Sequence, residues 1–315
     1  MAEWKTVTAS CHAMATFFEL VLWGEKEAYL EGVGREALEE IERWEAMLSF
    51  FRPTSDIGEI NRCAAYEPTT VDPRVFRLLE RAQQLSAATG GAFDITVAPL
   101  LRCWGFAGGS GQMPTEEEVA VARERVGGHH LHLNADDFTV SYDREGVLVD
   151  LGAIGKGFAI EQAAELLRDY EIPSALIHGG TSTIYALGAP PDAEAWTVAI
   201  QKPQGAEGEY LAQAVLRDRA LSVSAPHGKW FESEGRKYGH VIDPRTGYPT
   251  NRNLLAALIT ESATESDALS TALLTRGVDW IPELLRLLPG SSALVAFEDD
   301  TGEMRLAAEG PDWRF

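Results

Sequence analysis

The sequence is poor in cysteine and has no long apolar run. Its three cysteines, Cys11, Cys63 and Cys103, are an odd number and lie far apart, which excludes a disulfide framework and a zinc-binding pattern. No window of roughly 18 apolar residues is present, so we predict no transmembrane segment. The first residues, MAEWKTVTASC, lack a basic stretch followed by an apolar one. We therefore expect the chain as given to be cytoplasmic, or exported or periplasmic if a leader was removed from it.

Positive charge is also scarce. There are 27 Lys and Arg against 48 Asp and Glu, a formal net charge of −21 at pH 7. Such a surface repels a phosphate backbone, and we predict no binding of nucleic acid. An anionic ligand would have to be held by a metal ion, by backbone N–H groups or by a few placed cations.

The hydrophobic pattern predicts an α+β protein. Helical spacing or end signals predict helices over 35–48, 75–88, 154–170 and 264–275 and a short acidic one from Pro114, with a turn-rich stretch at 52–61. Apolar or alternating runs predict strands over 17–23, 130–142 paired with 147–151, 175–178, 183–187, 196–200, 209–215, 220–223, 230–232, 237–242, 254–259, 293–297 and 304–307. Strands and helices do not alternate strictly, which favours largely antiparallel sheets with packed helices. No Pro-, Gly- or Ser-rich linker divides the chain, so we expect residues 1–315 to form a single domain.

The segment from Ser262 to Thr271 offers oxygen ligands for a metal. Asp267 and Thr271 are four residues apart and would point the same way from a helix. A carboxylate and a hydroxyl suit a hard cation such as Mg²⁺ or Ca²⁺ better than zinc. The alternative is an exposed acid near a helix N-terminus, where it complements the helix dipole.

A glycine-rich turn lies between a predicted strand and helix at Val149–Phe158. Gly152, Gly155 and Gly157 would let backbone approach a ligand, and Lys156 supplies a local cation. The pattern matches neither a P-loop nor a dinucleotide fingerprint. An ordinary packed strand–helix turn is the alternative explanation.

Two further segments carry polar groups in turn-rich surroundings. Asp94 and Thr96 interrupt the apolar stretch Gly90–Leu100, where Asp94 could form a turn or hydrogen-bond a ligand beside Phe93. His240 precedes an Asp-Pro-Arg-Thr-Gly turn and could serve as a general base, a phosphate contact or a structural histidine.

These segments, taken together and in order, resemble the FAD:protein FMN transferase family, also called the ApbE family. The resemblance covers nearly the whole chain, in the motifs Ala13-Met-Ala-Thr16, Leu48-Ser-Phe-Phe51, Ser55-Asp-Ile-Gly-Glu-Ile-Asn61, Gly90-Gly-Ala-Phe-Asp-Ile-Thr96, Asp150-Leu-Gly-Ala-Ile-Gly-Lys-Gly157, His240-Val-Ile-Asp-Pro-Arg-Thr-Gly247 and Asp267-Ala-Leu-Ser-Thr271. It implies a T-fold-like ApbE architecture.

The resemblance also implies the chemistry. Members bind FAD, use Mg²⁺ and transfer FMN to a Thr or Ser of an acceptor protein, releasing AMP. It makes Asp267, Thr271 and the Ala153 carbonyl metal ligands with Ser270 close by, and His240 the catalytic residue. The positions that would line the FAD site are Met14, Phe51, Ala92, Phe93, Asp94, Asp150, Lys156 and Val241.

The sequence departs from the family pattern at three places. It has Gly179-Gly-Thr-Ser182 where relatives often carry Gly-Gly-Asp, Ser224-Ala-Pro-His227 for Ser-Gly-Asp/Asn-Tyr, and Met14-Ala-Thr16 for Met-Gly-Thr. Two other functions therefore remain open, a Mg²⁺-dependent FAD pyrophosphatase that yields FMN and AMP, and a non-catalytic FAD-binding protein.

Overall fold

An antiparallel sheet of eight strands organises the structure. The computed structural model describes residues 4–109, 111–206 and 208–315. The strand order is β1-β2-β6-β7-β10-β15-β16-β17. In that order the strands span Lys5–Ala13, Thr16–Gly24, Ser174–Gly179, Thr183–Leu187, Arg219–Ser224, Asn253–Thr260, Ser292–Glu298 and Met304–Glu309. The mixture of helices and antiparallel sheets confirms the predicted α+β class.

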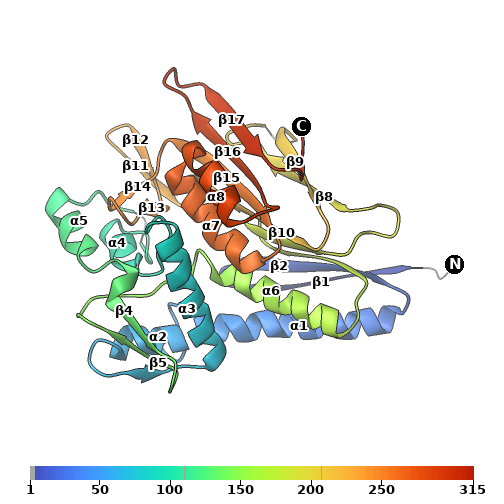
Figure 1. Ribbon diagram of the computed structural model, residues 1–315, viewed down its shortest axis with the longest axis horizontal. Coiled ribbons are helices and arrows are strands. Elements are labelled where there is room, and N and C mark those ends of the chain that lie inside the picture. The colour runs from blue at the N-terminus through green and yellow to red at the C-terminus, as the bar shows by residue number, and fades with distance from the viewer. Residues whose placement is uncertain (1–3, 110, 207) are drawn as a thin grey trace.

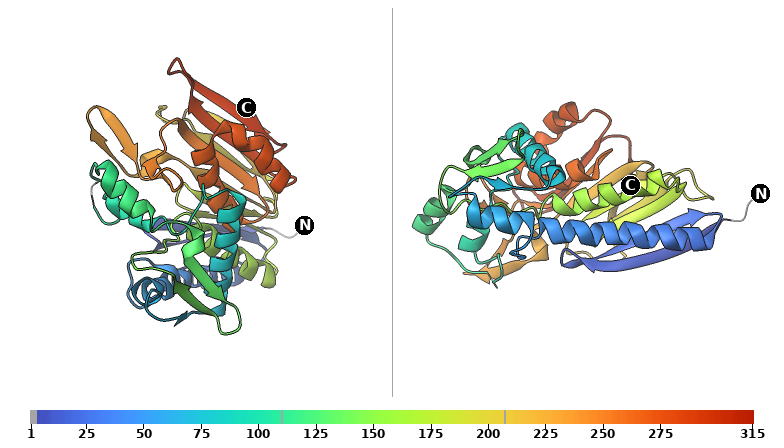
Figure 2. Two further views of the ribbon diagram at one scale, coloured as in Figure 1. Left: turned by 60° about the vertical axis from the view of Figure 1, so that its left-hand side comes forward. Right: turned by 90° about the horizontal axis from the view of Figure 1, so that it is seen from below.

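Three long helices cover one face of this sheet (Figure 1). They are α1 (Glu27–Leu48), α6 (Gly155–Asp169) and α7 (Ala263–Arg276). Figure 2, right, shows α1 and α6 side by side, and α6 in turn contacts α7. A three-stranded sheet of β18 (Trp313–Arg314), β9 (Tyr210–Leu216) and β8 (Trp196–Gln201) packs on part of the other face.

Burial from both sides explains the composition of β15. Its Ala256 and Leu258 belong to the core under the helices, whereas Leu255, Ala257 and Ile259 belong to the core between the two sheets. All eight residues of β15 are buried. A strand covered on both faces requires an apolar run instead of alternation, which the segment 254–259 has.

Helix α8 (Ile281–Leu287) lies beside α7 and contacts β16 (Figure 1). The other elements surround one end of this layered body. They are α2 (Asp56–Cys63), α3 (Pro73–Ala88), α4 (Ala98–Cys103), α5 (Glu116–Arg123), the sheet of β3 (Thr69–Thr70), β5 (Thr139–Tyr142) and β4 (Leu131–Asn134), the pair of β13 (Ile242–Asp243) and β14 (Tyr248–Pro249), and the hairpin of β11 (Trp230–Ser233) and β12 (Arg236–Gly239). This hairpin projects beside α5 (Figure 1; Figure 2, left). No helix among the described residues is long and apolar enough to cross a membrane.

Several predicted elements are wrong in extent or kind. The first helix begins at Glu27, not at residue 35, because Leu30 and Val33 are also buried against the sheet. Part of the turn-rich stretch 52–61 is instead helix α2, whose N-cap Ser55 accepts a hydrogen bond from Gly58 N at 2.9 Å. The edge strand β1 and helix α8 were not predicted, since the Thr- and Ser-rich alternation of β1 gives a weak apolar signal.

The predicted strand over 147–151 is absent from the described structure. Within 130–142 the chain forms β4 and β5, which pair with each other. Val149 is held by a side chain: its N–H donates to Asn61 Oδ1 at 2.7 Å, and its carbonyl accepts from Asn61 Nδ2 at 2.8 Å. One asparagine thereby replaces a strand partner, and this leads the chain into the glycine-rich turn.

Candidate functional site

Helix α7 carries the predicted metal ligands and is fixed at both ends. Its N-cap Ser262 accepts a hydrogen bond from Glu265 N at 3.2 Å, and Gly277 ends the helix with a positive φ of 77°. Asp267 lies in its second turn and is only 4% exposed. The alternative of an exposed acid at a helix N-terminus is therefore wrong.

Both carboxylate oxygens of Asp267 accept hydrogen bonds from other elements. Gly157 N, in the first turn of α6, donates to Oδ2 at 2.9 Å. Thr183 Oγ1, at the start of β7, donates to Oδ1 at 3.1 Å. With two donors among the described residues, this buried carboxylate retains lone pairs for a further ligand.

The first turn of α6 approaches α7 because residue 157 is glycine. A Cβ at this position would lie 2.2 Å from the Ala263 carbonyl oxygen and 2.7 Å from Asp267 Cβ. With the Gly157 N–H given to Asp267, no backbone N–H of the described residues donates to the Ala153 carbonyl. That oxygen keeps its lone pairs, two residues before α6 begins.

The two hydroxyls that follow Asp267 on α7 differ in their surroundings. Ser270 is 0% exposed and donates to the Asp267 carbonyl at 3.0 Å, while its Oγ lies 2.8 Å from Ser224 Oγ. Thr271 is half-buried, with its Oγ1 3.2 Å from the same Ser224 oxygen. Of the two, Thr271 is the better placed to meet a ligand from solvent.

The chemistry of these donors fits a hard divalent cation. A carboxylate, a hydroxyl and a backbone carbonyl are all oxygen ligands of the kind that Mg²⁺ binds, with water and phosphate oxygens completing its shell. The described residues contain no cluster of three or more His, Cys, Asp or Glu that could hold a metal. This excludes a nitrogen- or sulfur-rich centre there, but not a site built around one carboxylate.

The glycine-rich turn places Asp150 beside Lys156. Gly152 N donates to Asp150 Oδ1 at 2.7 Å, and Lys156 Nζ donates to the Gly152 carbonyl at 3.0 Å. Burial raises the pKa of the Asp150 carboxyl, while the Gly152 hydrogen bond and the charges of Lys156 and Lys229 oppose that shift. Lys156 is the cation that the sequence predicted at this turn.

The segment Ala92–Asp94 is buried and tied to its neighbours. Asp94 Oδ2 accepts from Ser86 Oγ at 2.9 Å and from Gly128 N at 2.8 Å, and its Oδ1 accepts from Thr96 N at 2.8 Å. Phe93 is 2% exposed, and the Ala92 carbonyl accepts a bond of 3.2 Å from Thr275 Oγ1 of α7. In this structure Asp94 orders its own loop, and its contact with FAD stays a prediction.

Met14 and Phe51 occupy different surroundings. Met14 is half-buried in the two-residue turn between β1 and β2, with a φ of 49°. Phe51 is 72% exposed and stands edge-on to Phe50 at 5.3 Å between ring centroids. No hydrogen bond or ring contact among the described residues joins Phe51 to another predicted site residue, so its role also stays a prediction.

His240 lies at the base of the β11–β12 hairpin. Its backbone N–H donates to the Lys229 carbonyl at 3.0 Å, and Lys229 N donates to its Nδ1 at 3.4 Å. Burial lowers the pKa of His240 below 6.5, and the charges of Lys229 and Lys156 act in the same direction. The charge of Lys156 thus influences His240, and we take the two residues to belong to one site. The neighbouring Val241 is half-buried, and its carbonyl accepts from Thr250 N at 2.9 Å.

Sequence reasoning missed the residues that support these groups. Asn61 holds the chain before Asp150, and Thr183, Ser222 and Ser224 contact the polar face of α7 directly or through one another. Asn61 lies in a motif that carried the family resemblance. The alternation of Ser222 and Ser224 was the available signal, since both point to one face of β10.

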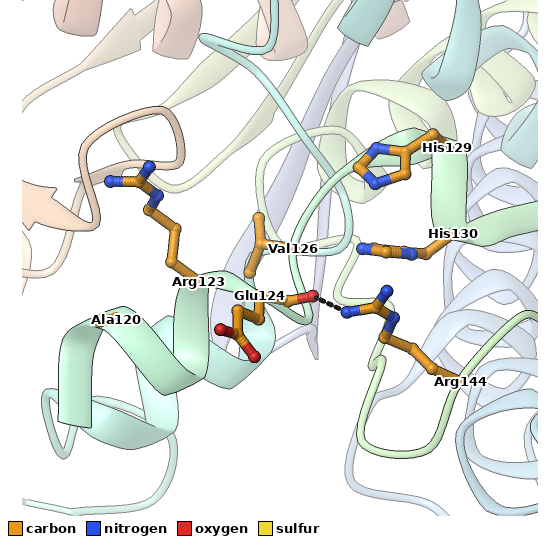
Figure 3. A pocket seen from close by; sticks show the side chains of 7 residues that line it. All are labelled: Ala120, Arg123, Glu124, Val126, His129, His130 and Arg144. Carbon is orange, nitrogen blue, oxygen red and sulfur yellow. Dashed lines mark hydrogen bonds between the residues drawn. The ribbon is translucent and has the colours of Figure 1, made fainter. Parts of the chain in front are cut away.

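A separate hollow lies away from these residues. It has a volume of about 440 Å³ and is lined by Ala120, Arg123, Glu124, Val126, His129, His130 and Arg144 (Figure 3). Arg144 donates across it to the Glu124 carbonyl at 2.8 Å, and His130 Nδ1 lies 2.8 Å from Asp143 Oδ1. None of the predicted site residues lines this hollow.

A sequence profile of the ApbE family matches residues 14–295. The FAD:protein FMN transferase of Treponema pallidum is 31% identical over 281 residues, which cover 84% of this chain and 77% of that protein. The protein of the same name from Haemophilus influenzae is 31% identical over 242 residues, 74% of this chain and 69% of that protein.

Solved structures agree with these sequence matches. The crystal structure of the ApbE protein of Thermotoga maritima superposes with a TM-score of 0.87 at 26% identity, covering 96% of each chain. The flavin transferase ApbE of Vibrio cholerae gives a TM-score of 0.82 at 26% identity, covering 97% of each chain. The expected ApbE architecture is thereby confirmed.

Proposed function

The chain belongs to the ApbE family, and we propose that it is an FAD:protein FMN transferase. In this reaction the hydroxyl oxygen of a Thr or Ser on an acceptor protein attacks the FMN phosphorus of FAD. The bond from that phosphorus to the bridging oxygen breaks, AMP leaves with the bridging oxygen, and FMN remains on the acceptor as a phosphoester. The substrates are FAD and a protein, and Mg²⁺ is required.

The observation that carries the proposal is the meeting of α6 and α7 at Gly157 and Asp267. Asp267 is a buried carboxylate, Thr271 carries a half-buried hydroxyl one turn further along α7, and no backbone N–H of the described residues donates to the Ala153 carbonyl, four residues before Gly157. We assign Mg²⁺ to these three, with Ser270 supporting them. Bound there, Mg²⁺ would neutralise charge on the FAD pyrophosphate.

Lys156 and Asp150 would hold the other side of the substrate. Lys156 supplies positive charge that the chain as a whole lacks, next to the N-terminus of α6. We place the flavin portion of FAD along the segments containing Met14, Ala92, Phe93 and Val241. Because these segments come from distant parts of the sequence, they also support the single domain that we propose for residues 1–315.

His240 would take the proton of the attacking hydroxyl. Its lowered pKa favours the neutral imidazole at pH 7, which has one unprotonated nitrogen. In this structure that nitrogen, Nδ1, accepts a long hydrogen bond of 3.4 Å from Lys229 N, which the attacking hydroxyl would displace. The positive charges of Lys229 and Lys156 that favour the neutral ring also attract the anionic substrate. The same two lysines would therefore bind the negative charge of FAD and keep His240 unprotonated.

One assay separates the transferase from the other two functions. The protein is incubated with FAD and Mg²⁺, with and without a Thr-containing acceptor protein, and AMP release and acceptor mass are measured. AMP that appears only with acceptor, together with a covalent FMN mass shift, supports the transferase. AMP without acceptor would identify a pyrophosphatase, and FAD binding without AMP would identify a binding protein.

A substitution tests the metal assignment. Asp267→Asn keeps the side-chain volume and removes the charge, so we expect at least a 100-fold loss of Mg²⁺-dependent transfer with the fold retained. Asp312→Asn is the matched control, since that carboxylate is also hydrogen-bonded, to Ser292 Oγ at 2.7 Å, but lies outside the site. Unchanged transfer in Asp267→Asn would refute the assignment.

A further inference from the structure

Two buried hydroxyls connect the centre of the large sheet to Asp267. Ser222 Oγ of β10 lies 3.1 Å from Thr183 Oγ1 of β7, which lies 3.1 Å from Asp267 Oδ1 of α7. Ser222 and Thr183 are 0% exposed and Asp267 is 4% exposed. The three residues come from three different elements, so their contact depends on the packing of α7 on the sheet.

The chemistry of the groups fixes the direction of both hydrogen bonds. A carboxylate can only accept, so the single hydroxyl proton of Thr183 goes to Asp267 Oδ1. The Thr183 oxygen then accepts the single proton of Ser222. Each hydroxyl therefore donates its one proton in this chain of hydrogen bonds, and the chain ends at the carboxylate.

This arrangement also fixes the orientation of the carboxylate. Oδ1 is held from the sheet by Thr183, and Oδ2 is held from α6 by Gly157 N at 2.9 Å. Thr183 is β-branched on a strand, which restricts its χ1 and therefore the place of its hydroxyl. The carboxylate plane is set by two donors on separate rigid elements, and the remaining lone pairs face away from them.

We propose that Thr183, supported by Ser222, is a positioning residue that presets the Asp267 carboxylate for the divalent cation. The inference rests on the proposed function, since it takes Asp267 to be a metal ligand. Hydrogen bonds from such supporting groups orient ligands, and their loss typically weakens metal binding by 10- to 100-fold. Neither hydroxyl touches the cation or FAD in this assignment.

Strand β10 supports the neighbouring hydroxyls in the same way. Ser224 is two residues beyond Ser222, so both side chains face α7. Its Oγ lies 2.8 Å from Ser270 Oγ and 3.2 Å from Thr271 Oγ1. One strand therefore reaches both the carboxylate and the hydroxyl that we assign to the metal.

The test measures metal affinity instead of activity. Thr183→Val removes the hydroxyl but keeps the shape of the side chain, and Thr183→Ser restores it. For each full-length variant, Mg²⁺ is titrated calorimetrically into protein saturated with FAD, and FAD is titrated separately in metal-free buffer. Thr139→Val is the matched control, because Thr139 is also a buried strand threonine donating to an aspartate, Asp137, at 2.7 Å.

We expect Thr183→Val to raise the Kd for Mg²⁺ by 10- to 100-fold, as is typical of supporting residues around a metal. Thr183→Ser should stay within about threefold of wild type, and Ser222→Ala should give a smaller loss than Thr183→Val. The metal-free Kd for FAD and the Kd for Mg²⁺ of Thr139→Val should not change. The melting temperature of each variant shows whether it is folded. If Thr183→Val does not fold, the Mg²⁺ affinity of Ser222→Ala tests the inference in its place.

Three results would overturn the inference in distinguishable ways. If Asp267→Asn weakens Mg²⁺ binding but folded Thr183→Val and Ser222→Ala bind it as wild type does, the positioning role is wrong and the metal site stands. If Thr183→Ser is as weak as Thr183→Val, the hydroxyl is not the operative group. If wild type binds no Mg²⁺, the proposed metal site fails and the positioning role fails with it.

Discussion

Gly157 donates its backbone N–H to Oδ2 of Asp267 at 2.9 Å, across 110 positions of the sequence. The bond joins the first turn of α6 to the second turn of α7. It requires an approach so close that a Cβ on residue 157 would overlap the Ala263 carbonyl oxygen. The catalytic arrangement that we propose therefore depends on one missing side-chain atom.

Replacing Gly157 with alanine should separate α6 from α7. The added Cβ would meet backbone, at 2.2 Å from an oxygen that cannot rotate away. We expect a loss of about 3 kcal/mol in the free energy of unfolding, at the upper end of overpacking costs, and loss of Mg²⁺-dependent FMN transfer. Urea unfolding and the transfer assay measure the two effects.

Gly155→Ala is the control for this substitution. A Cβ at residue 155 would lie 3.7 Å from Leu151 Cβ and 3.9 Å from Leu48 Cδ1, which is ordinary contact. Alanine is favoured over glycine in a helix by roughly 0.5–1 kcal/mol, so this variant should be at least as stable as wild type. Equal behaviour of the two variants would show that the close approach of α6 and α7 is unimportant.

The pH dependence of transfer should follow His240. Because burial lowers its pKa below 6.5, His240 stays neutral, and so able to accept a proton, at pH 7. We expect kcat/KM to be level through pH 7 and to fall only below pH 6.5, as the ring becomes protonated. The unfolded chain binds this proton more readily, so the contribution of His240 to stability also declines as the pH falls below about 6.5.

Substitution of His240 provides the check on this assignment. His240→Gln should lower transfer by about 10²- to 10⁴-fold. The kcat/KM of its residual activity should not decline below pH 6.5. FAD binding should remain. If kcat/KM of His240→Gln declines at acidic pH in the same way as that of wild type, another group is responsible for the pH dependence.

Removing the charge of Lys156 should have two effects of known sign. Lys156→Met takes a cation away from the phosphate-binding end of α6, and a hydrogen bond to a charged group is worth about 1.5–3 kcal/mol, so FAD binding should weaken by about tenfold or more. Loss of the same positive charge raises the pKa of His240. The decline of kcat/KM at acidic pH should therefore begin at a higher pH.

A lysine outside the site is the control for this prediction. Lys202 pairs with Glu209 at 3.5 Å in the connection between β8 and β9, and Lys202→Met should change neither FAD affinity nor the pH profile. If the decline of kcat/KM begins at a lower pH in Lys156→Met, the charge of Lys156 does not lower the pKa of His240.

The sequence predicted elements whose apolar pattern reports burial directly. The run 254–259, covered on both faces, and the helix over 264–275, ended by Gly277, are both found as β15 and α7. The strand β1 was missed because small polar residues, Thr6, Thr8 and Ser10, alternate along it. The segment 147–151 was wrongly predicted as a strand from its apolar residues, since Asn61 holds it instead of a strand partner. Local patterns carry no information about such distant partners.

The candidate site shows the same division. The helical spacing of Asp267 and Thr271 could be read from the sequence, because it depends on residues four apart. The donors to Asp267 could not, since Gly157 and Thr183 reach it only after α6, β7 and α7 have packed together. Burial of Asp267, which removes the alternative of an exposed acid, is likewise a property of the packed structure.

The turn between β1 and β2 stores strain that one substitution should release. Met14 and Ala15 both have positive φ, of 49° and 58°, in a two-residue hairpin loop of the type that favours glycine and asparagine. A non-glycine residue in this region costs about 1–2 kcal/mol, and the greater entropy of unfolded glycine offsets part of the gain. Ala15→Gly should therefore raise the free energy of unfolding by about 0.5 kcal/mol, measured by urea unfolding.

The adjacent Ala13 distinguishes relief of strain from any general effect of glycine. Ala13 is the last residue of β1, 0% exposed and in extended conformation, so Ala13→Gly removes a buried methyl group and should lower the free energy of unfolding by about 1 kcal/mol. Opposite signs for the two variants would place the strain at Ala15. A loss of stability in Ala15→Gly equal to that in Ala13→Gly would mean that the left-handed turn carries no strain to release.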